Sequence, residues 1–250
     1  MPDDGSYGPE TYGDRVAEVY DTLFPDPTQT RGAAELEILE RLAEGAGPAL
    51  ESGIGTGRIA LPLRERGAEV EEIDASSAMI AKLWAKPGGT ELVVHEGSFA
   101  EFELAGRYSL IYVVFNTFFA LLTQADQISC FRSVAQHLMP DGVFALEAFV
   151  PDLNRYRQHQ SAGAYRVELD EAWLDLAVHD PVKQQIRVQQ IQFKGGTQQM
   201  YQIELRYAWP SELDLMAQLA GLTRRERWGG WGRQPFDADS QKHVSVFGRA

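Results

Sequence analysis

The stretch "ALESGIGTGRIALPL", residues 49 to 63, decides the fold of this chain. It opens on apolar residues and the acidic Glu51, places glycines at alternate positions 53, 55 and 57, and ends in a helix-like run. Glycine accepts the tight backbone turns that other residues resist. A buried strand, a glycine turn and a helix in this order predict a turn that binds a nucleotide or nucleoside at the edge of a parallel sheet.

The alternation of strand and helix continues on the C-terminal side of this turn. We expect strands at residues 48–52, 68–76, 90–98, 108–116 and 143–151. Alternating units of this kind form a parallel sheet with helices on both faces, and ligands bind beyond the carboxyl ends of its strands. The segments predicted to share one rim of the sheet are therefore 51–58, 74–76, 97–99 and 115–117.

The pattern changes after Pro151, where apolar and polar residues alternate and Gly195–Gly196 signals a hairpin. The expected fold class is α/β: a Rossmann-like, doubly wound, mostly parallel seven-stranded sheet with an inserted antiparallel β lid. The expected parts are an N-terminal helical cap at 1–45, the ligand-binding core at 46–151, the lid at 152–208 and the C-terminal completion of the core sheet at 209–250.

Composition narrows the class of partner. The chain has 250 residues, of which 44% are hydrophobic, and a formal net charge of −13. Nucleic acid is bound largely through Lys and Arg, so this acidic chain is not expected to bind it. The sequence has no apolar run of membrane-spanning length and no secretory signal, which favours a cytoplasmic protein without a membrane partner. Cys130 is the only cysteine, so neither a disulfide nor a cysteine-based metal site is expected.

Three kinds of site compete for the glycine turn. A phosphate loop requires Lys followed by Ser or Thr after its last glycine, but Arg58 and Ile59 stand there. A dinucleotide fingerprint fits only if Ala60 replaces its third glycine. The observed E-x-G-x-G-x-G pattern is followed by Asp74 at the end of the next strand, where a carboxylate can accept hydrogen bonds from ribose hydroxyls. A nucleoside without a pyrophosphate is favoured, and a nicotinamide-dependent oxidoreductase remains the alternative.

At these residues the sequence resembles the class I S-adenosylmethionine (SAM)-dependent methyltransferases. The resemblance rests on "ESGIGTGR" and "IDASSAM", and extends to "EGSFAEF" (96–102), "VVFNTFFALL" (113–122) and "HLMPDGVFALEAF". The N-terminal "YGDRVAEVYD…TRGAAEL" also resembles glycine N-methyltransferase and related small-molecule enzymes, so the similarity covers residues 12 to about 150. It implies a SAM cofactor and methyl transfer to the N, O or C atom of a small organic acceptor.

The resemblance also implies a set of cofactor-binding residues. They are Tyr12, Tyr20, Arg31, Glu51, Gly53, Gly55, Gly57, Arg58, Asp74, Ala75, Met79, Ser98, Phe99, Phe115 and Asn116. By resemblance Arg31 pairs with the methionine carboxylate, Asp74 holds the ribose, and Ser98 and Phe99 meet the adenine. Arg58 is a second partner for the carboxylate or simply begins its helix, and Met79 packs on the nucleoside or in the core.

Other residues face the methionine portion of the cofactor by the same resemblance. The glycines, Phe115 and Asn116 lie along it, Glu51 orients the loop or meets the ammonium group, and Tyr12 and Tyr20 cover the sulfonium. The sequence departs from the family pattern at three places: Ser52 before the first glycine, the Glu71–Glu72 pair before Ile73, and Ser98 in place of Asp or Asn. These departures bear on how tightly the cofactor is held.

The aromatic residues of the lid and rim indicate an apolar pocket for a small acceptor. The expected pocket residues are Phe149, Tyr156, Tyr201 and Trp209. The candidates for a catalytic base on the rim and lid are Glu147, Asp152, His159, His179, Tyr201 and His243. Neither His243 nor Glu147 has a partner visible in the sequence, so no catalytic base is assigned, and no metal site is expected. The lid is also a candidate surface for a homo-oligomer. A protein of the same fold that binds SAM without methyl transfer, as scaffold, regulator or pericyclase-like enzyme, is the alternative function.

Overall fold

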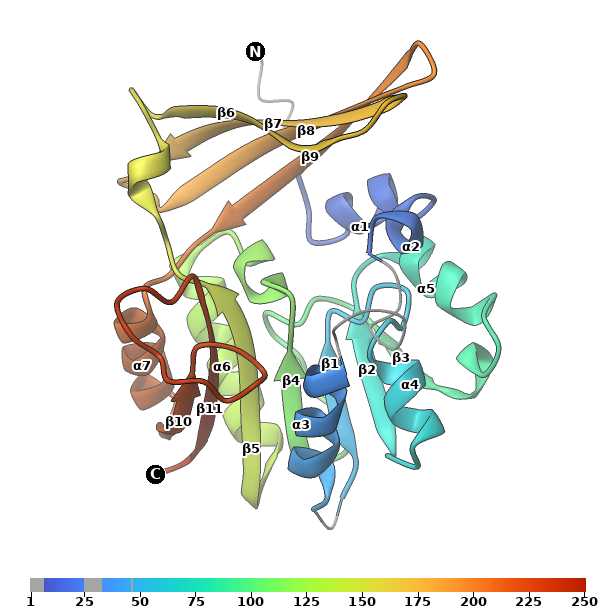
Figure 1. The fold of residues 1–250 in the computed structure, drawn as a ribbon. Coiled ribbons are helices and arrows are strands. Elements are labelled where there is room, and N and C mark those ends of the chain that lie inside the picture. The colour runs from blue at the N-terminus through green and yellow to red at the C-terminus, as the bar shows by residue number, and fades with distance from the viewer. Residues whose placement is uncertain (1–6, 25–32, 46) are drawn as a thin grey trace.

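The computed structural model describes residues 7–24, 33–45 and 47–250, and Figure 1 displays two layers of β structure. The larger sheet has the order β10-β11-β5-β4-β1-β2-β3. Its strands are β1 (Ala49–Ser52), β2 (Val70–Asp74), β3 (Val93–Glu96), β4 (Tyr108–Val113), β5 (Leu138–Phe149), β10 (Leu222–Trp228) and β11 (Lys242–Arg249). All neighbours from β3 to β5 pair in parallel, whereas β11 runs antiparallel to both β5 and β10. The predicted mostly parallel seven-stranded sheet is confirmed.

Helices cover both faces of this sheet (Figure 1). They are α3 (Ala33–Ala43), α4 (Ala60–Glu65), α5 (Ser77–Trp84), α6 (Gln124–His137) and α7 (Pro210–Leu219), whereas α1 (Thr11–Val16) and α2 (Tyr20–Leu23) lie above the end of the sheet, beneath the lid (Figure 1). The described residues also form short 3-10 turns at η2 (Gly89–Glu91), η3 (Thr117–Ala120) and η4 (Leu153–Arg155). Phe131 of α6 and Leu213 of α7 pack on one face, while Leu36 and Leu39 of α3 and Leu63 of α4 pack on the other. These buried contacts fix the carboxyl ends of β1, β2 and β4 at one rim.

The lid is a separate antiparallel sheet above this rim (Figure 1). Its strands, in spatial order, are β6 (Gln160–Val167), β7 (Glu171–Asp180), β8 (Gln185–Lys194) and β9 (Thr197–Arg206). The predicted hairpin at Gly195–Gly196 joins β8 to β9, and both glycines have positive φ. The inserted antiparallel sheet is confirmed, whereas the exact part boundaries at 46, 152 and 209 stay a prediction.

Two element boundaries differ from those expected. Residues 14–24, whose apolar spacing predicts one helix within the N-terminal cap, divide into α1 and α2, because the Val19 N–H donates a hydrogen bond to the Val16 carbonyl in a tight turn between them. Strand β5 begins at Leu138 rather than at 143. Leu138 pairs with Tyr108, and a register shift follows before the pairing resumes at Leu110 and Val143, so the Pro140–Gly142 stretch is an irregularity of the strand.

Candidate active site

The three glycines form the turn between β1 and α4. Gly53, Gly55 and Gly57 have φ values of +78°, +60° and +77°. This left-handed region is strained for other residues, so the sequence pattern is required by the backbone. Space is equally restricted at two of them, where an added Cβ would collide with Thr117 or Leu83. The turn thus presents bare backbone at the end of β1.

Asp74 joins the glycine turn to the loop after β2. Its two carboxylate oxygens each accept a backbone N–H at 2.8 Å, from Gly55 and from Ser76. Burial raises the pKa of Asp74 above its usual value, and these backbone donors oppose that rise. Each carboxylate oxygen has a second lone pair, so Asp74 can hold both loops and still accept hydrogen bonds from a ligand. Ala75 follows it on the same loop, partly buried.

The N-terminal helices are fastened to these two loops. Asp14 of α1 accepts the Ser76 hydroxyl at 2.6 Å, and Asp21 of α2 accepts the Thr56 hydroxyl at 2.5 Å. Tyr20 lies over the turn, since a Cβ at Gly55 would sit 3.7 Å from its ring. Burial raises the pKa of Tyr20 to about 12, so this phenol is neutral.

Tyr12 and Tyr20 of the N-terminal helical cap pack against one cluster that includes Met79 of α5. Met79 is buried in a cluster with Val16, Trp173 and Tyr201, and Tyr12 packs against that cluster. Burial also raises the pKa of Tyr12. The structure therefore places Met79 among core side chains beneath α1. Arg31 lies outside the described residues.

Glu51 is buried at the end of β1, and its carboxylate accepts the Tyr112 hydroxyl at 3.0 Å. Burial raises the pKa of Glu51 to about 8. Arg58 lies nearby with its guanidinium 5.0 Å from the centre of the Phe115 ring and 3.7 Å from the Glu35 carboxylate. Arg58 therefore lies beside Phe115 and Glu35, just before α4 begins at Ala60. Sequence analysis missed Glu35, which lies in an ordinary amphipathic helix.

Glu72 is the acidic residue near the site whose buried charge is least compensated by polar neighbours. It pairs in register with Glu51 on the neighbouring strand, is fully buried, and neither carboxyl oxygen has a hydrogen-bond partner among the described residues. Burial, followed by the charges of Glu51 and Asp74, raises the pKa of Glu72 to about 9. A buried carboxyl without a partner avoids the cost of a charge by staying protonated.

The end of β4 turns sharply at Phe115 and Asn116, which both have positive φ, 56° and 66°. Two side chains hold the turn: Glu147 accepts the Phe115 N–H at 3.0 Å, and Asn116 accepts the Phe149 N–H at 2.7 Å. Lys242 of β11 pairs with Glu147 at 2.9 Å. The predicted Phe115 and Asn116 therefore reach the rim, and Glu147 is a support within β5 that sequence analysis considered only as a base.

The third loop brings Ser98 and Phe99 to the same rim. Phe99 is buried against the glycine turn, since its ring would lie 3.5 Å from a Cβ on Gly53. The Ser98 hydroxyl accepts the Ala100 N–H at 3.2 Å. The segments that follow β1, β2, β3 and β4 thus meet around one site, as their parallel order requires.

A cavity of about 750 Å³ opens between the lid, the end of β5 and the loop between β10 and β11. Three of the four predicted pocket residues line it: Phe149, Tyr156 and Trp209. Tyr207 of the lid and three carboxylates, Asp152, Asp175 and Asp239, line it too. Asp239 lies in the loop between β10 and β11, far from the lid in sequence. No sequence pattern predicts that this residue lines the cavity.

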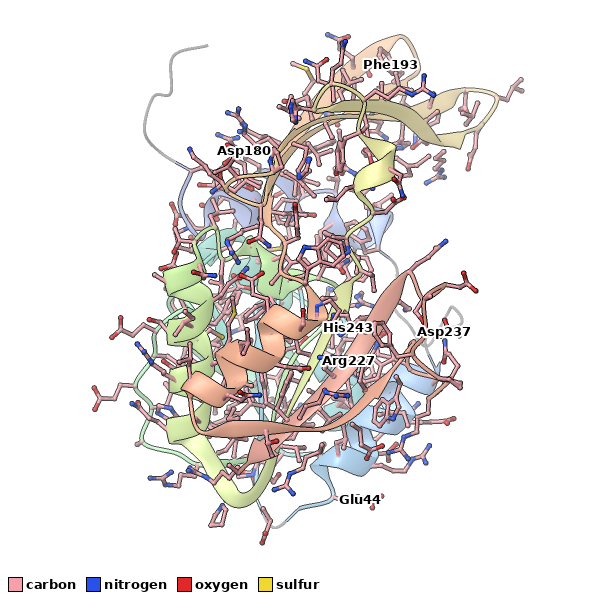
Figure 2. All side chains as sticks on the ribbon, turned by 90° about the vertical axis from the view of Figure 1, so that its left-hand side faces the viewer. Glu44, Asp180, Phe193, Arg227, Asp237 and His243 are labelled. Carbon is pink, nitrogen blue, oxygen red and sulfur yellow. The ribbon has the colours of Figure 1, made fainter. Side chains whose placement is uncertain are left out.

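The fourth predicted pocket residue, Tyr201, lies elsewhere. It is buried and stacks on Trp173 with ring centres 5.8 Å apart, over α1. Two of the histidines considered as bases, His179 and His243, also contact other residues. His179 hydrogen-bonds the Tyr207 hydroxyl at 2.9 Å, and His243 lies beside Arg227 in the core sheet (Figure 2), where burial lowers its pKa to about 3.

The described residues contain no group of three or more His, Cys, Asp or Glu side chains arranged to hold a metal ion. Within the same part of the chain, no helix is both long enough and apolar enough to span a membrane.

Residues 49–142, from β1 into β5, match the family model described as "Methyltransferase domain". The solved structure of the CcbJ methyltransferase from Streptomyces caelestis is 38% identical, with a TM-score of 0.89 over 98% of this chain and 100% of that one. The chain belongs to the class I SAM-dependent methyltransferases. Its cofactor is accordingly SAM.

Two curated relatives of this methyltransferase are also similar in sequence. The cypemycin N-terminal methyltransferase of a Streptomyces species is 26% identical over 242 residues, which cover 96% of this chain and 98% of that protein. The dTDP-3-amino-3,6-dideoxy-alpha-D-glucopyranose N,N-dimethyltransferase of Streptomyces fradiae is 30% identical over 144 residues, 56% of each chain. The similarity to the first relative includes the lid of this methyltransferase.

Proposed function

We propose that this enzyme transfers the methyl group of SAM to an amine nitrogen of a small organic acceptor bound in the 750 Å³ cavity. One observation carries the proposal: Phe149 lines that cavity, and its backbone N–H is bonded to Asn116 on the cofactor rim. The choice of nitrogen is supported by the names of the two curated relatives: one is an N,N-dimethyltransferase of an amino sugar, and the other is an N-terminal methyltransferase, and a peptide N-terminus carries an amine.

The residues of the rim fit SAM. Positive-φ glycines allow close approach of a ligand to the backbone, and Glu35 has a buried oxygen, Oε1, without a hydrogen-bond partner among the described residues. Glu35 and Glu51 would receive the ammonium group, with Arg58 beside the carboxylate. Asp74 would accept the ribose hydroxyls through its free lone pairs. As predicted by resemblance, Arg31 would also pair with the methionine carboxylate.

The remaining predicted residues are assigned to the other parts of the cofactor. Ser98 and Phe99 would contact the adenine, and Phe115 and Asn116 the methionine portion. When bound, SAM supplies an electrophilic methyl group on a sulfonium centre. Tyr12 and Tyr20 would close over this centre and exclude water, and an aromatic face also favours a nearby cation.

Catalysis would then depend mainly on positioning, because an in-line displacement gains most from alignment of the two reactants. Phe149, Tyr156 and Trp209 would hold the acceptor against the rim. The carboxylates of Asp152, Asp175 and Asp239 outnumber Arg155 in the cavity lining, and this excess of negative charge favours binding of a protonated amine. No catalytic base is assigned.

The proposal is tested by incubating the enzyme with labelled SAM and a panel of small amines, alcohols and acidic carbon compounds. Label in an amine product together with S-adenosylhomocysteine supports it. Transfer only to oxygen or carbon refutes the choice of nitrogen. Tight SAM binding without turnover on any acceptor would favour the scaffold alternative.

We also propose that the lid mediates self-association. The end of the lid that carries the β6–β7 and β8–β9 turns exposes apolar side chains, which a second copy could cover. These side chains are Tyr165, Val167, Leu169 and Met200. Analytical ultracentrifugation of the wild type and of Leu169→Asp tests this, since a monomeric wild type would refute it. The predicted cytoplasmic location is likewise a proposal, to be tested by cell fractionation.

A further inference from the structure

The lid carries a second, larger cavity of about 1200 Å³, which the proposed methyl transfer does not use. Its lining includes four arginines from three separate parts of the fold: Arg15 of α1, Arg155 of η4, Arg157 just after it, and Arg187 of β8. Figure 2 marks Asp180 and Phe193 at opposite ends of the lid, and Arg187 lies toward the Asp180 end.

Strand register explains how Arg187 reaches this cavity. Val178, Arg187 and Glu204 form one cross-strand row, and their side chains point to the face opposite that of Ala177 and Val188. Ala177 is buried toward the acceptor cavity, whereas Val178 and Arg187 are exposed. Gln202 belongs to this outer face and accepts a hydrogen bond from Arg15 at 3.0 Å. The arginines thus converge on the outer side of the lid.

The four guanidinium groups lack close ion-pair partners among the described residues. None of the four forms an ion pair within 4.0 Å there, although nine other arginines of the described chain do, among them Arg166 with Glu168. Arg155 lies 5.6 Å from the centre of the Tyr156 ring. Glu204 is the one acidic residue among the described lining residues, opposite Arg187 in register.

Such a concentration of positive charge is unusual in a chain of net charge −13. Like charges gathered in one groove repel one another, and a bound multivalent anion would remove that repulsion. Guanidinium groups present paired N–H donors that match the oxygens of phosphate groups. The cavity volume exceeds what a single phosphate requires and suits a ligand of nucleotide size.

We propose that this arginine groove binds a small organic diphosphate of nucleotide size. A small ligand is favoured over a long polyanion because the positive charge is confined to one concavity. A nucleic acid would extend onto the acidic remainder of the protein, and at physiological ionic strength the attraction of the groove fades within about 8 Å. The groove adjoins the acceptor cavity through Arg155, which lines both.

Isothermal titration calorimetry on the full chain tests the proposal without any measurement of methyl transfer. The probes are uridine diphosphate and inorganic pyrophosphate, with S-adenosylhomocysteine present to occupy the cofactor site. The double variant Arg157→Gln/Arg187→Gln changes two exposed groove residues. Arg166→Gln is the matched control, because Arg166 lies in β6, pairs with Glu168 and does not line the groove.

We expect at least one probe to bind, with affinity that falls as salt is raised. The double variant should weaken this binding tenfold or more, while the control changes it less than twofold. Absence of binding by both probes, or equal binding by the double variant and the wild type, would overturn the proposal. So would binding of an acidic polyglutamate peptide by a protein that binds neither probe. Because the readout is binding alone, its failure is distinct from failure of the methyl-transfer proposal.

Discussion

Asn116 and Phe149 link the cofactor rim to the acceptor cavity, since the Asn116 side-chain oxygen accepts the Phe149 backbone N–H at 2.7 Å. Asn116 adopts a positive φ of 66° in the turn after β4, and Phe149 ends β5 at the wall of the cavity. One hydrogen bond therefore sets the position of the proposed acceptor relative to the proposed cofactor.

This link predicts the behaviour of two substitutions. Asn116→Gly keeps the left-handed turn accessible but removes the amide, so kcat/KM for the acceptor should fall about tenfold, equivalent to roughly 1.4 kcal/mol of transition-state stabilisation. Asn116→Asp keeps an acceptor oxygen and should retain more activity than the glycine variant. Steady-state kinetics with saturating SAM measure both, and wild-type kinetics for Asn116→Gly would remove the link from the account.

Asp74 is expected to control cofactor affinity. Asp74→Ala removes the acceptor for the Gly55 and Ser76 N–H groups as well as for a ribose, so the Kd for SAM should rise at least tenfold, about 1.4 kcal/mol. Calorimetric titration measures this. Asp74→Asn retains one acceptor oxygen and should have an intermediate effect. An unchanged Kd in the alanine variant would discard the ribose assignment.

Glu72 predicts a dependence of stability on pH. Its pKa rises from the ordinary 4.5 to about 9 in the folded protein, so the folded state holds a proton that the unfolded state releases between these values. Stability is therefore reduced progressively as pH rises from 4.5 to about 9. Glu72→Gln is neutral at every pH and should remove this penalty.

We expect Glu72→Gln to raise the free energy of unfolding by on the order of 4 kcal/mol more at pH 8 than at pH 5. Thermal unfolding at both pH values measures the difference. Glu69→Gln is the control, because Glu69 lies just before the same strand with an exposed side chain. A stabilisation independent of pH would show that the charge of Glu72 is not its cause.

Trp209 is expected to contribute to binding of the acceptor and not to binding of the cofactor. It lines the cavity, and its side chain is 40% exposed, so Trp209→Ala removes an aromatic wall without opening the core. The KM for the acceptor should rise fivefold or more, about 1 kcal/mol, with an unchanged Kd for SAM. Trp84→Ala, at an exposed position at the end of α5, serves as the control. Equal effects of both variants on KM would argue against the cavity as the acceptor site.

The sequence predicts the fold and the rim well because both depend on local signals. Gly53, Gly55 and Gly57 satisfy a backbone requirement, and Asp74 follows from the next buried strand. The alternation of strands and helices then requires the loops of β1, β2, β3 and β4 to meet. No tertiary information is needed for these predictions.

The acceptor side depends on contacts between distant segments, and there the sequence is less informative. Tyr201 and Tyr207 lie on one strand and its end, yet Tyr201 stacks on Trp173 over α1 while Tyr207 faces the cavity. The place where the lid meets the N-terminal helices decides whether an aromatic residue packs in the core or lines the cavity. Asp239 enters the site from a loop of irregular sequence for the same reason.

The central claim is methyl transfer from SAM to a small amine held beside Phe149. Mass spectrometry of a reaction with purified enzyme, SAM and an amine panel tests it most directly, by following product and S-adenosylhomocysteine together. We expect an amine that gains the mass of one methylene group, with one S-adenosylhomocysteine formed per methyl transferred. S-adenosylhomocysteine formation with no methylated amine, or methylation at oxygen or carbon alone, would contradict it.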